Sequence, residues 1–374
     1  MRRAFVLGGV VAAIAGGAIL AAASARSPDR AAFSFLFAYF SVFGVVVGAL
    51  FVLGVGNASD ARWFVVTRRL VEHVTAVLPL LAVLFVPVFA AARRVYPWAR
   101  SETGRLTRSA FGVRGAIYLV VLLAIGERLR AVSLRQDDPA SDAGALRRRL
   151  VAWSAVALPL MALTLTGASF DWAMSLEPSW FSDVYGVYVF AGGFLAALGV
   201  LGVALVISHR GGLLPARVSA EHFHAVGRLE LAMVIFWAYI GWAQLLLVWI
   251  ADQPLEVPWY IARWHGGWES IGLALLVVHF VLPFAFLLGR TGKRRALPLF
   301  CVSGWLVIAH FLDVYYLIVP ARSPGRLDFA LTDLAACVGL VGASVAFGAA
   351  RAAHVPFYPL RDPLLEKSIE YEAA

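Results

Sequence analysis

Ten apolar runs, each long enough to cross a lipid bilayer, constrain this chain more than any other feature. At 1.5 Å per residue, about 20 helical residues span a hydrocarbon core of about 30 Å. Only 15% of the 374 residues are charged, against about a quarter in soluble domains. The sequence therefore predicts an all-α, polytopic membrane protein with transmembrane helices at about 4–23, 31–56, 70–90, 109–126, 151–168, 184–207, 229–250, 268–289, 296–319 and 330–350.

The first run has two interpretations. Residues 1–25, MRRAFVLGGVVAAIAGGAILAAASA, have the basic start, apolar middle and small-residue end of a secretory signal peptide. Their apolar stretch of about twenty residues exceeds the usual length of about 7 to 15. We expect a retained transmembrane helix, with cleavage as the alternative.

The distribution of positive charge predicts the orientation, because cytoplasmic loops carry the excess of Lys and Arg. Of the 32 Lys and Arg residues, 21 fall on the side of the N-terminus, 10 on the other side, and Arg114 inside a run. Both termini are therefore predicted to be cytoplasmic. The connection 91–108 fits least well, since it places five arginines outside, Arg105 among them.

One outer connection, residues 169–186 (SFDWAMSLEPSWFSDVYG), contains no Lys or Arg. It does contain Asp171 and two tryptophans, Trp172 and Trp180. Translocated loops avoid positive charge, and Trp favours the membrane interface. An interfacial segment on the outer surface is the simplest interpretation.

Several functions are excluded by residues that are missing. Cys301 and Cys337 stand alone, without CxxC or CxxCH spacing, so we expect no iron–sulfur cluster, covalent haem or other metal on this chain. The net charge of +9 comes from clusters beside the apolar runs, such as 147–149 and 293–295. These suit anionic lipid headgroups, and we expect no nucleic-acid partner.

Ionisable residues inside the runs are the best functional candidates, because they are costly there and usually face the protein interior. His310 and Asp313 are three residues apart and share a helix face, which Tyr316 continues. Such a pair can pass a proton or hold a quinol hydroxyl, since a neighbouring carboxylate tunes a histidine. A structural pair that joins two helices is an equal alternative.

Other candidates have simple structural alternatives. His279 lies four residues before Pro283, which can kink the helix, and is a ligand or a buried hydrogen-bonding residue. Arg114 and Tyr118, one turn apart, either anchor the helix at the interface or pair with an outer carboxylate.

Glu72 and His73 lie near the inner end of the third run and are expected to reach the interface. Glu269 is expected to cap the eighth helix. With Asp171 and Asp313 in the outer half and Glu72 and Glu230 in the inner half, the layout predicts an outer polar site with a partial route from the cytoplasm. The alternative is that the ends of ten ordinary helices produce this layout by chance.

Six stretches carry a resemblance to a known family. They are SFDWAMSLEPSWFSDVYGVYVFAGG (169–193), FWAYIGWAQLLLVW (236–249), WYIAR (259–263), HFVLPFAFLLGR (279–290), HFLDVYYLIVP (310–320) and PLRDPLLEKSIEYE (359–372). Together they resemble the second, smaller NrfD-like (polysulfide-reductase-type) membrane subunit of bacterial alternative complex III, a quinol:cytochrome c oxidoreductase.

The resemblance implies a fold and its partners. The fold is two four-helix bundles flanked by one helix on each side. The implied partners in the bacterial inner membrane are the larger NrfD-like subunit, a periplasmic iron–sulfur protein, and multihaem and monohaem c-type cytochromes. Quinol is expected mainly on the larger subunit, with this chain non-catalytic or assisting the quinone site, and conducting protons.

The implied boundaries are 1–30 for the first helix and its loop, 31–168 for the first bundle, 169–183 for the outer segment, 184–319 for the second bundle, 320–350 for the last helix and 351–374 for a cytoplasmic tail.

One departure from the family pattern concerns proton uptake. Where the family has His-Asp-x-Gly-Lys before the seventh helix, residues 224–228 read His-Ala-Val-Gly-Arg. The carboxylate is missing, and Glu230 is the nearest substitute.

Within this resemblance, Trp172 and Trp180 are predicted to form a docking floor for a periplasmic subunit, with interfacial anchoring as the alternative. Two other functions stay open: a secondary transporter or ion-conducting membrane protein, and a b-type haem anchor that uses His279 and His310.

Overall fold

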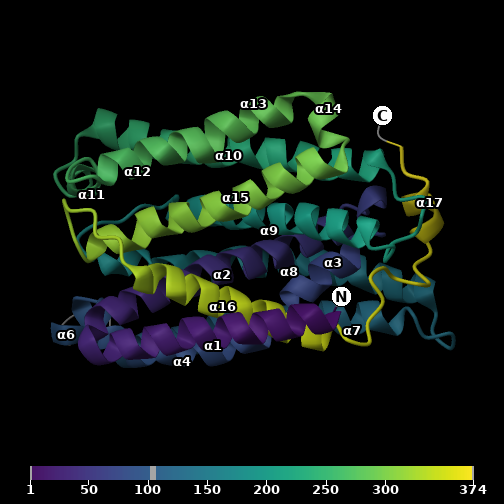
Figure 1. Cartoon of the computed structure of the whole chain (residues 1–374), viewed down its shortest axis with the longest axis horizontal. Helices are drawn as coiled ribbons and strands as arrows, with labels where there is room; N and C mark the ends of the chain where they lie inside the picture. Colours follow the sequence, from purple (N-terminus) through teal and green to yellow (C-terminus); the bar gives the residue numbers. More distant parts are fainter. Residues whose placement is uncertain (1, 102–106, 373–374) are drawn as a thin grey trace.

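The structure is a computed structural model that describes residues 2–101 and 107–372. Every regular element in these residues is a helix (Figure 1), and ten spans are long and apolar enough to cross a membrane. The prediction of an all-α polytopic membrane protein is thus confirmed. The spans are α1 (Arg2–Arg26), α2 (Pro28–Ala58), α3 (Arg68–Thr75) with α4 (Leu78–Ala90), α7 (Arg108–Arg135), α8 (Ala143–Trp172), α9 (Tyr185–Arg210), α10 (Ala220–Ala251), α12 (Trp268–Leu275) with α13 (Leu282–Leu288), α15 (Ala296–Ile318) and α16 (Leu331–Arg351).

Short helices lie in the connections: α5 (Ala92–Val95), α6 (Trp98–Ser101), α11 (Val257–Arg263), α14 (Arg290–Lys293) and α17 (Leu365–Ile369). The two chain ends lie at the same end of the molecule, which we call the termini end; α6 and α11 lie at the opposite, far end (Figure 1). Arg105 of the connection 91–108 lies outside the described residues, as do residues 1, 373 and 374 at the chain ends.

The spans pack around α2, whose apolar window is completely buried. On one side α2 contacts α3, α4 and α8, and α7 packs on α4 and α8; on the other side α2 contacts α9, which packs on α10 and α15. α2 and α9 approach closely because each has a glycine at the point of contact, Gly48 on α2 and Gly193 on α9. A Cβ on Gly48 would lie 2.1 Å from the carbonyl oxygen of Gly193. A helix that is apolar all round suits a position that is buried on every side.

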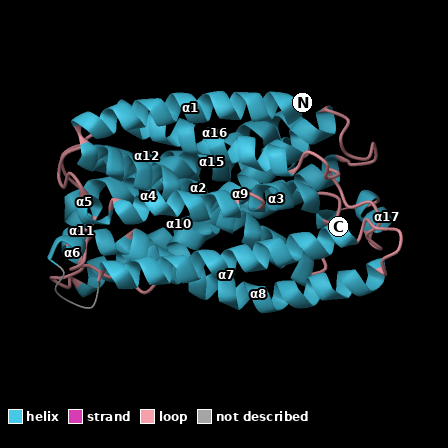
Figure 2. Cartoon of the chain, turned by 90° about the horizontal axis from the view of Figure 1, so that it is seen from below, coloured by secondary structure: helices cyan, strands magenta, loops and turns pink. Residues whose placement is uncertain are grey.

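The first and last spans pack against each other, so the expectation of one flanking helix on each side is corrected. α1 runs along α16 (Figures 1 and 2). The contact is glycine to glycine, since a Cβ on Gly9 would meet the carbonyl of Gly342 at 2.6 Å and one on Gly16 would lie 2.5 Å from the amide of Gly339. Small residues on both helices allow this close packing in a membrane, where hydrophobicity alone does not drive association.

Two spans are interrupted. The third bends at Ala76 and Val77, between α3 and α4. The eighth contains a π-helical turn, Leu276–Val281, between α12 and α13. Pro283 has no N–H for the carbonyl of His279 and its ring crowds that carbonyl, which is the physical reason for widening the helix there.

The C-terminal tail is held across the termini end by polar contacts. Asp362 accepts hydrogen bonds from Arg68 (2.6 Å) and Arg147 (3.2 Å). Ser368 accepts from the amide of Val66 at 3.0 Å, and its carbonyl lies 2.8 Å from Nε2 of His222. Burial by itself would raise the pKa of Asp362, but Arg68, the Leu364 amide and Arg147 outweigh it and lower this pKa below its ordinary value of 3.8.

Candidate functional site

A buried carboxylate, Asp313, lies in the far half of α15 and is 2% exposed. The Tyr188 hydroxyl of α9 donates to its Oδ1 at 2.5 Å, and the Trp237 indole N–H of α10 donates to its Oδ2 at 3.1 Å. Among residues 2–101 and 107–372 no Lys, Arg or His forms an ion pair with it. Asp313 is therefore held by two neutral donors from two neighbouring helices.

A second buried carboxylate lies in the same bundle, nearer the termini end. Glu230 of α10 is fully buried and accepts a hydrogen bond at 2.6 Å from the hydroxyl of Ser303 on α15. Its other oxygen, Oε2, has no hydrogen-bond partner in the described part of the chain. No Lys or Arg of residues 2–101 and 107–372 forms an ion pair with Glu230 either.

The two carboxylates lie along one seam between α10 and α15. Glu230 and Trp237 are seven residues apart on the buried face of α10, and Ser303 and Asp313 are ten apart on the buried face of α15. At 1.5 Å per residue these separations are about 10 and 15 Å. The Glu230–Ser303 and Trp237–Asp313 contacts are thus two polar contacts along one interface between α10 and α15. We call this pair of contacts the ladder.

Two buried histidines lie close to this ladder. His279, in the π-helical turn, packs its ring 4.1 Å from the Trp237 ring, and neither ring nitrogen has a hydrogen-bond partner among the described residues. Nε2 of His310 lies 3.2 Å from the carbonyl of Ser41 on α2, whereas its Nδ1 is unpartnered. The two imidazoles are near enough to interact electrostatically.

The predicted His310–Asp313 pair is corrected. Both side chains do lie on the same face, since a Cβ added to Gly192 would be 3.5 Å from Nδ1 of His310 and 3.1 Å from Oδ2 of Asp313. No hydrogen bond joins them in the structure. The carboxylate oxygens of Asp313 instead accept from Tyr188 and Trp237, and Nε2 of His310 lies against the carbonyl of Ser41.

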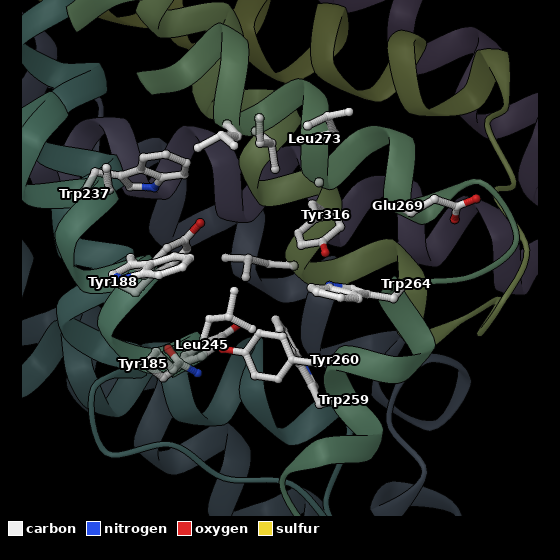
Figure 3. Close-up of a pocket in the computed structure, with 18 residues that line it drawn as sticks. Tyr185, Tyr188, Trp237, Leu245, Trp259, Tyr260, Trp264, Glu269, Leu273 and Tyr316 are labelled. Atoms are coloured by element: carbon white, nitrogen blue, oxygen red, sulfur yellow. The ribbon is translucent and has the colours of Figure 1, made fainter. Parts of the chain in front are cut away.

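An aromatic pocket of about 480 Å³ lies next to Asp313, toward the far end. Tyr188 and Trp237, the two donors to Asp313, are at one end of it, and Trp264 and Glu269 are at the other (Figure 3). The remaining aromatic lining is Tyr185, Trp242, Trp259, Tyr260 and Tyr316. The Tyr188 hydroxyl therefore connects a buried carboxylate to a cavity.

Tyr260 and Glu269 also line the pocket. Burial raises the pKa of Tyr260 well above its ordinary value, so this phenol stays neutral. Glu269 is exposed and accepts from the Gly267 amide at 2.9 Å, the capping contact that the sequence predicts. It also lines the pocket, where it is a charged group in contact with solvent.

The first bundle has a carboxylate of a different kind. Asp171, near the end of α8, accepts two hydrogen bonds from Arg114 of α7, at 2.7 and 2.9 Å, and a third from the Tyr118 hydroxyl at 2.9 Å. Arg114 thus pairs with a carboxylate near the far end of the molecule, which agrees with the second of the two alternatives for this residue.

Trp172 and Trp180 point into the protein, with 0% and 4% of their surfaces exposed. The Trp172 ring packs 4.8 Å from that of Phe43, and the Trp180 ring stacks on that of Trp259 at 4.6 Å. In this conformation neither ring can touch a partner directly. An effect of these residues on docking would have to be indirect, and it stays a prediction.

Glu72 does not reach the interface as expected. It is 1% exposed, with one oxygen 3.3 Å from Arg68 and the other 3.3 Å from Arg69. Its neighbour His73 has no hydrogen-bond partner in the described residues and lines a second, apolar cavity. The two inner candidates therefore belong to different environments, both separate from the ladder.

Tyr188, Trp237 and Ser303 were not among the site residues predicted from the sequence. Tyrosine and tryptophan near helix ends are typical of the membrane interface, and a serine in an apolar helix usually bonds its own backbone. One signal was present: Trp237 lies seven residues from Glu230, which places both on one face.

No protein-family model matches this chain, and no curated protein matches it either. Within the described residues, no group of three or more His, Cys, Asp and Glu side chains is placed to hold a metal ion.

Proposed function

We propose that this chain is a membrane subunit of a respiratory quinol:cytochrome c oxidoreductase of the alternative complex III type, and that its second bundle conducts protons toward the periplasmic side. The resemblance of six stretches between residues 169 and 372 supports the family. The geometry of Asp313 supports the proton function.

The surroundings of Asp313 are the main support for proton conduction, because they contain no positively charged partner among the described residues. An ionised carboxylate in a dry interior is costly unless a cation or several donors compensate it. Within the described part of the chain Asp313 has two neutral donors and no cation, so its charged and protonated forms can be close in free energy. A group in that condition can take up and release a proton.

The ladder gives each residue a role. Glu230, two turns closer to the termini end, takes up a proton from that side. His310 lies between Ser303 and Asp313 on α15, and His279 packs on Trp237; among the described residues three of their four ring nitrogens have no hydrogen-bond partner. Asp313 receives the proton, and the Tyr188 hydroxyl, bonded to Oδ1, passes it on to the aromatic pocket. Glu269, at the outer rim, is the last acceptor before solvent.

The partners follow from the proposed family. The larger NrfD-like subunit would hold the main quinol site, and a periplasmic iron–sulfur protein with multihaem and monohaem c-type cytochromes would take the electrons. The bacterial inner membrane, with both termini cytoplasmic, is the corresponding location. This chain would contribute no redox centre, so electron and proton paths would be on different subunits.

Affinity purification of the tagged chain from its own membranes tests the family. Haem staining of covalent c-type cytochromes, iron analysis of the co-purifying proteins and quinol:cytochrome c reductase activity should all be positive. Recovery of the chain alone, as a homo-oligomer without haem or iron, would contradict the proposal.

A secondary transporter is the second candidate, since two spans are interrupted as in many transporters. In the third span the break is at Ala76 and Val77, and in the eighth it is the π-helical turn Leu276–Val281. These are the second span of the first bundle and the third span of the second bundle. Transporter repeats place such breaks at corresponding positions. The two breaks here are at different positions in their bundles, so the transporter function is the second candidate.

A further inference from the structure

A second cavity lies in the half of the molecule near the termini, between the α1–α16 pair and the helices α2, α3, α9 and α15. Its volume is about 390 Å³. Valines from α2, α9 and α15 supply much of its wall, with Phe311 at its deep end. Along α9 the lining runs from Val200 to Ser208, eight residues or about 12 Å, close to the thickness of one leaflet, about 15 Å.

The cavity reaches the outer surface of the helix bundle beside α16. Phe5 of α1 and Val341 and Val345 of α16 line it, and each of these side chains is about 40% exposed. Because α1 and α16 are membrane spans, this opening faces the position of lipid chains. The groove is therefore accessible from the bilayer.

The end of the groove nearest the termini is basic, with unused hydrogen-bonding capacity. Arg2 donates to the carbonyls of Ala353 and Val355, both at 2.5 Å, but its Nε has no partner and no carboxylate pairs with it in the described residues. Both nitrogens of His73 also have no hydrogen-bond partner among the residues that the structure describes. Arg2 and Arg130 act electrostatically on His73, and Nη1 of Arg130, itself buried, lacks a partner as well.

We propose that this groove binds one anionic phospholipid of the cytoplasmic leaflet, with an acyl chain against the valines and the phosphate at Arg2 and His73. A phosphate supplies what the mouth lacks, a negative charge with several acceptor oxygens for the Arg2 and His73 donors. Basic pockets between transmembrane helices on the cytoplasmic side are a known form of lipid recognition. A quinone or an apolar helix fits the valines but offers no anion.

Binding to the purified full-length chain tests this. After delipidation in detergent, native mass spectrometry is used to titrate dioleoylphosphatidylglycerol and, in parallel, zwitterionic dioleoylphosphatidylcholine. The first bound phosphatidylglycerol should have at least about fivefold higher affinity, since each arginine near an anionic headgroup contributes about that factor. Equal affinities for the two lipids would overturn the proposal.

Variants locate the site. Arg2→Gln should reduce phosphatidylglycerol affinity by about fivefold. His73→Ala, which removes one hydrogen-bond donor, should reduce it by about fivefold as well, and Ala204→Phe, which fills the groove, should abolish binding of the first lipid. Arg3→Gln is the matched control, because Arg3 is the next residue and is exposed; it should leave the affinity unchanged. If Arg3→Gln loses as much as Arg2→Gln, the attraction is a general surface effect and the groove is wrong.

Two further results decide against other occupants. The measured mass of the purified protein must include residues 2–26. A mass that lacks them would overturn the proposal, because a chain that has lost α1 has also lost Arg2. A photo-cross-linking amino acid at Ala349, which lines the groove, should capture lipid in native membranes. Capture of a polypeptide or a quinone instead would also overturn it.

Discussion

Asp171 and Asp313 occupy comparable places in the two bundles and have opposite chemical surroundings. Each lies near the far end of the last helix of its bundle, α8 or α15, and accepts from a tyrosine of that bundle. Asp171 also receives a two-point contact from Arg114, whereas Asp313 receives a single bond from the Trp237 indole. One carboxylate is neutralised by a cation and the other is not.

The difference shows how one residue type can serve two purposes in a membrane. A carboxylate bound by a guanidinium stays charged and joins two helices, since separating the pair would leave two uncompensated charges. A carboxylate between a phenol and an indole has neutral donors only, and a change in its protonation leaves no partner charge behind. We expect Asp171 to act in stability and Asp313 in turnover.

The largest effect should come from Asp313→Asn, which keeps the shape and removes the acid. Activity per assembled quinol:cytochrome c complex should fall by about tenfold to a hundredfold, because proton transfer by a positioned acid contributes at least this much, and the pH profile should change. Assembly on a native gel should be normal. Reduced assembly with normal turnover would make Asp313 a structural residue like Asp171.

Asp171→Asn should show the opposite pattern. The free energy of unfolding should decrease by about 1–2 kcal/mol, less than for a fully buried pair because the Arg114 side chain is 34% exposed. Activity per assembled complex should equal that of the wild type. The Tm of the purified chain measures the loss.

A double variant checks the cause. Arg114→Gln combined with Asp171→Asn should be more stable than either single variant, since no charge is left without a partner. If the two losses simply add, the ion pair is not what joins α7 and α8.

Tyr188→Phe tests the connection between Asp313 and the aromatic pocket. The ring is kept and only the hydroxyl is lost, so turnover should drop by about fivefold, the equivalent of one hydrogen bond of about 1 kcal/mol. Tyr118→Phe is the matched control in the first bundle, where the hydroxyl also donates to an aspartate. Equal loss of turnover in both variants would remove the distinction between the bundles.

Asp362 extends the comparison to the termini end, where a carboxylate again has arginine partners. Its pKa is lower in the folded protein than the ordinary 3.8, so the unfolded chain binds more protons between the two values. The stabilisation by Asp362, about 1 kcal/mol, is complete at neutral pH and is lost as the pH falls below about 4. Wild type and Asp362→Asn should therefore differ in urea unfolding at pH 7 and converge in strong acid; a constant difference would exclude linkage to Asp362.

The smallest effect concerns quinol. With the main site expected on the larger subunit, His279→Ala should leave the KM for quinol within about twofold of the wild type, even if turnover decreases. A rise of about fivefold or more in KM would place quinol on this chain, next to Trp237.

The sequence by itself determined which segments cross the membrane, because a span depends on about twenty consecutive apolar residues and on nothing distant. It also identified most of the ionisable groups inside those spans, including Glu230, His279 and Asp313. Pro283 predicted a kink in the eighth span, and the π-helical turn lies beside this proline.

Only the tertiary structure decided the partners of those groups, because partners come from distant parts of the chain. The i,i+3 spacing correctly put His310 and Asp313 on one face, but the carboxylate bonds to Tyr188 of α9, 125 residues away in sequence, and the histidine to Ser41 of α2. The packing of α1 on α16 and the burial of Trp172 are of the same kind. Hydropathy is a property of a single segment. The partner of a buried charged group depends on which helix packs against its own helix. That packing is determined by how glycine-lined and bulky helix surfaces fit together.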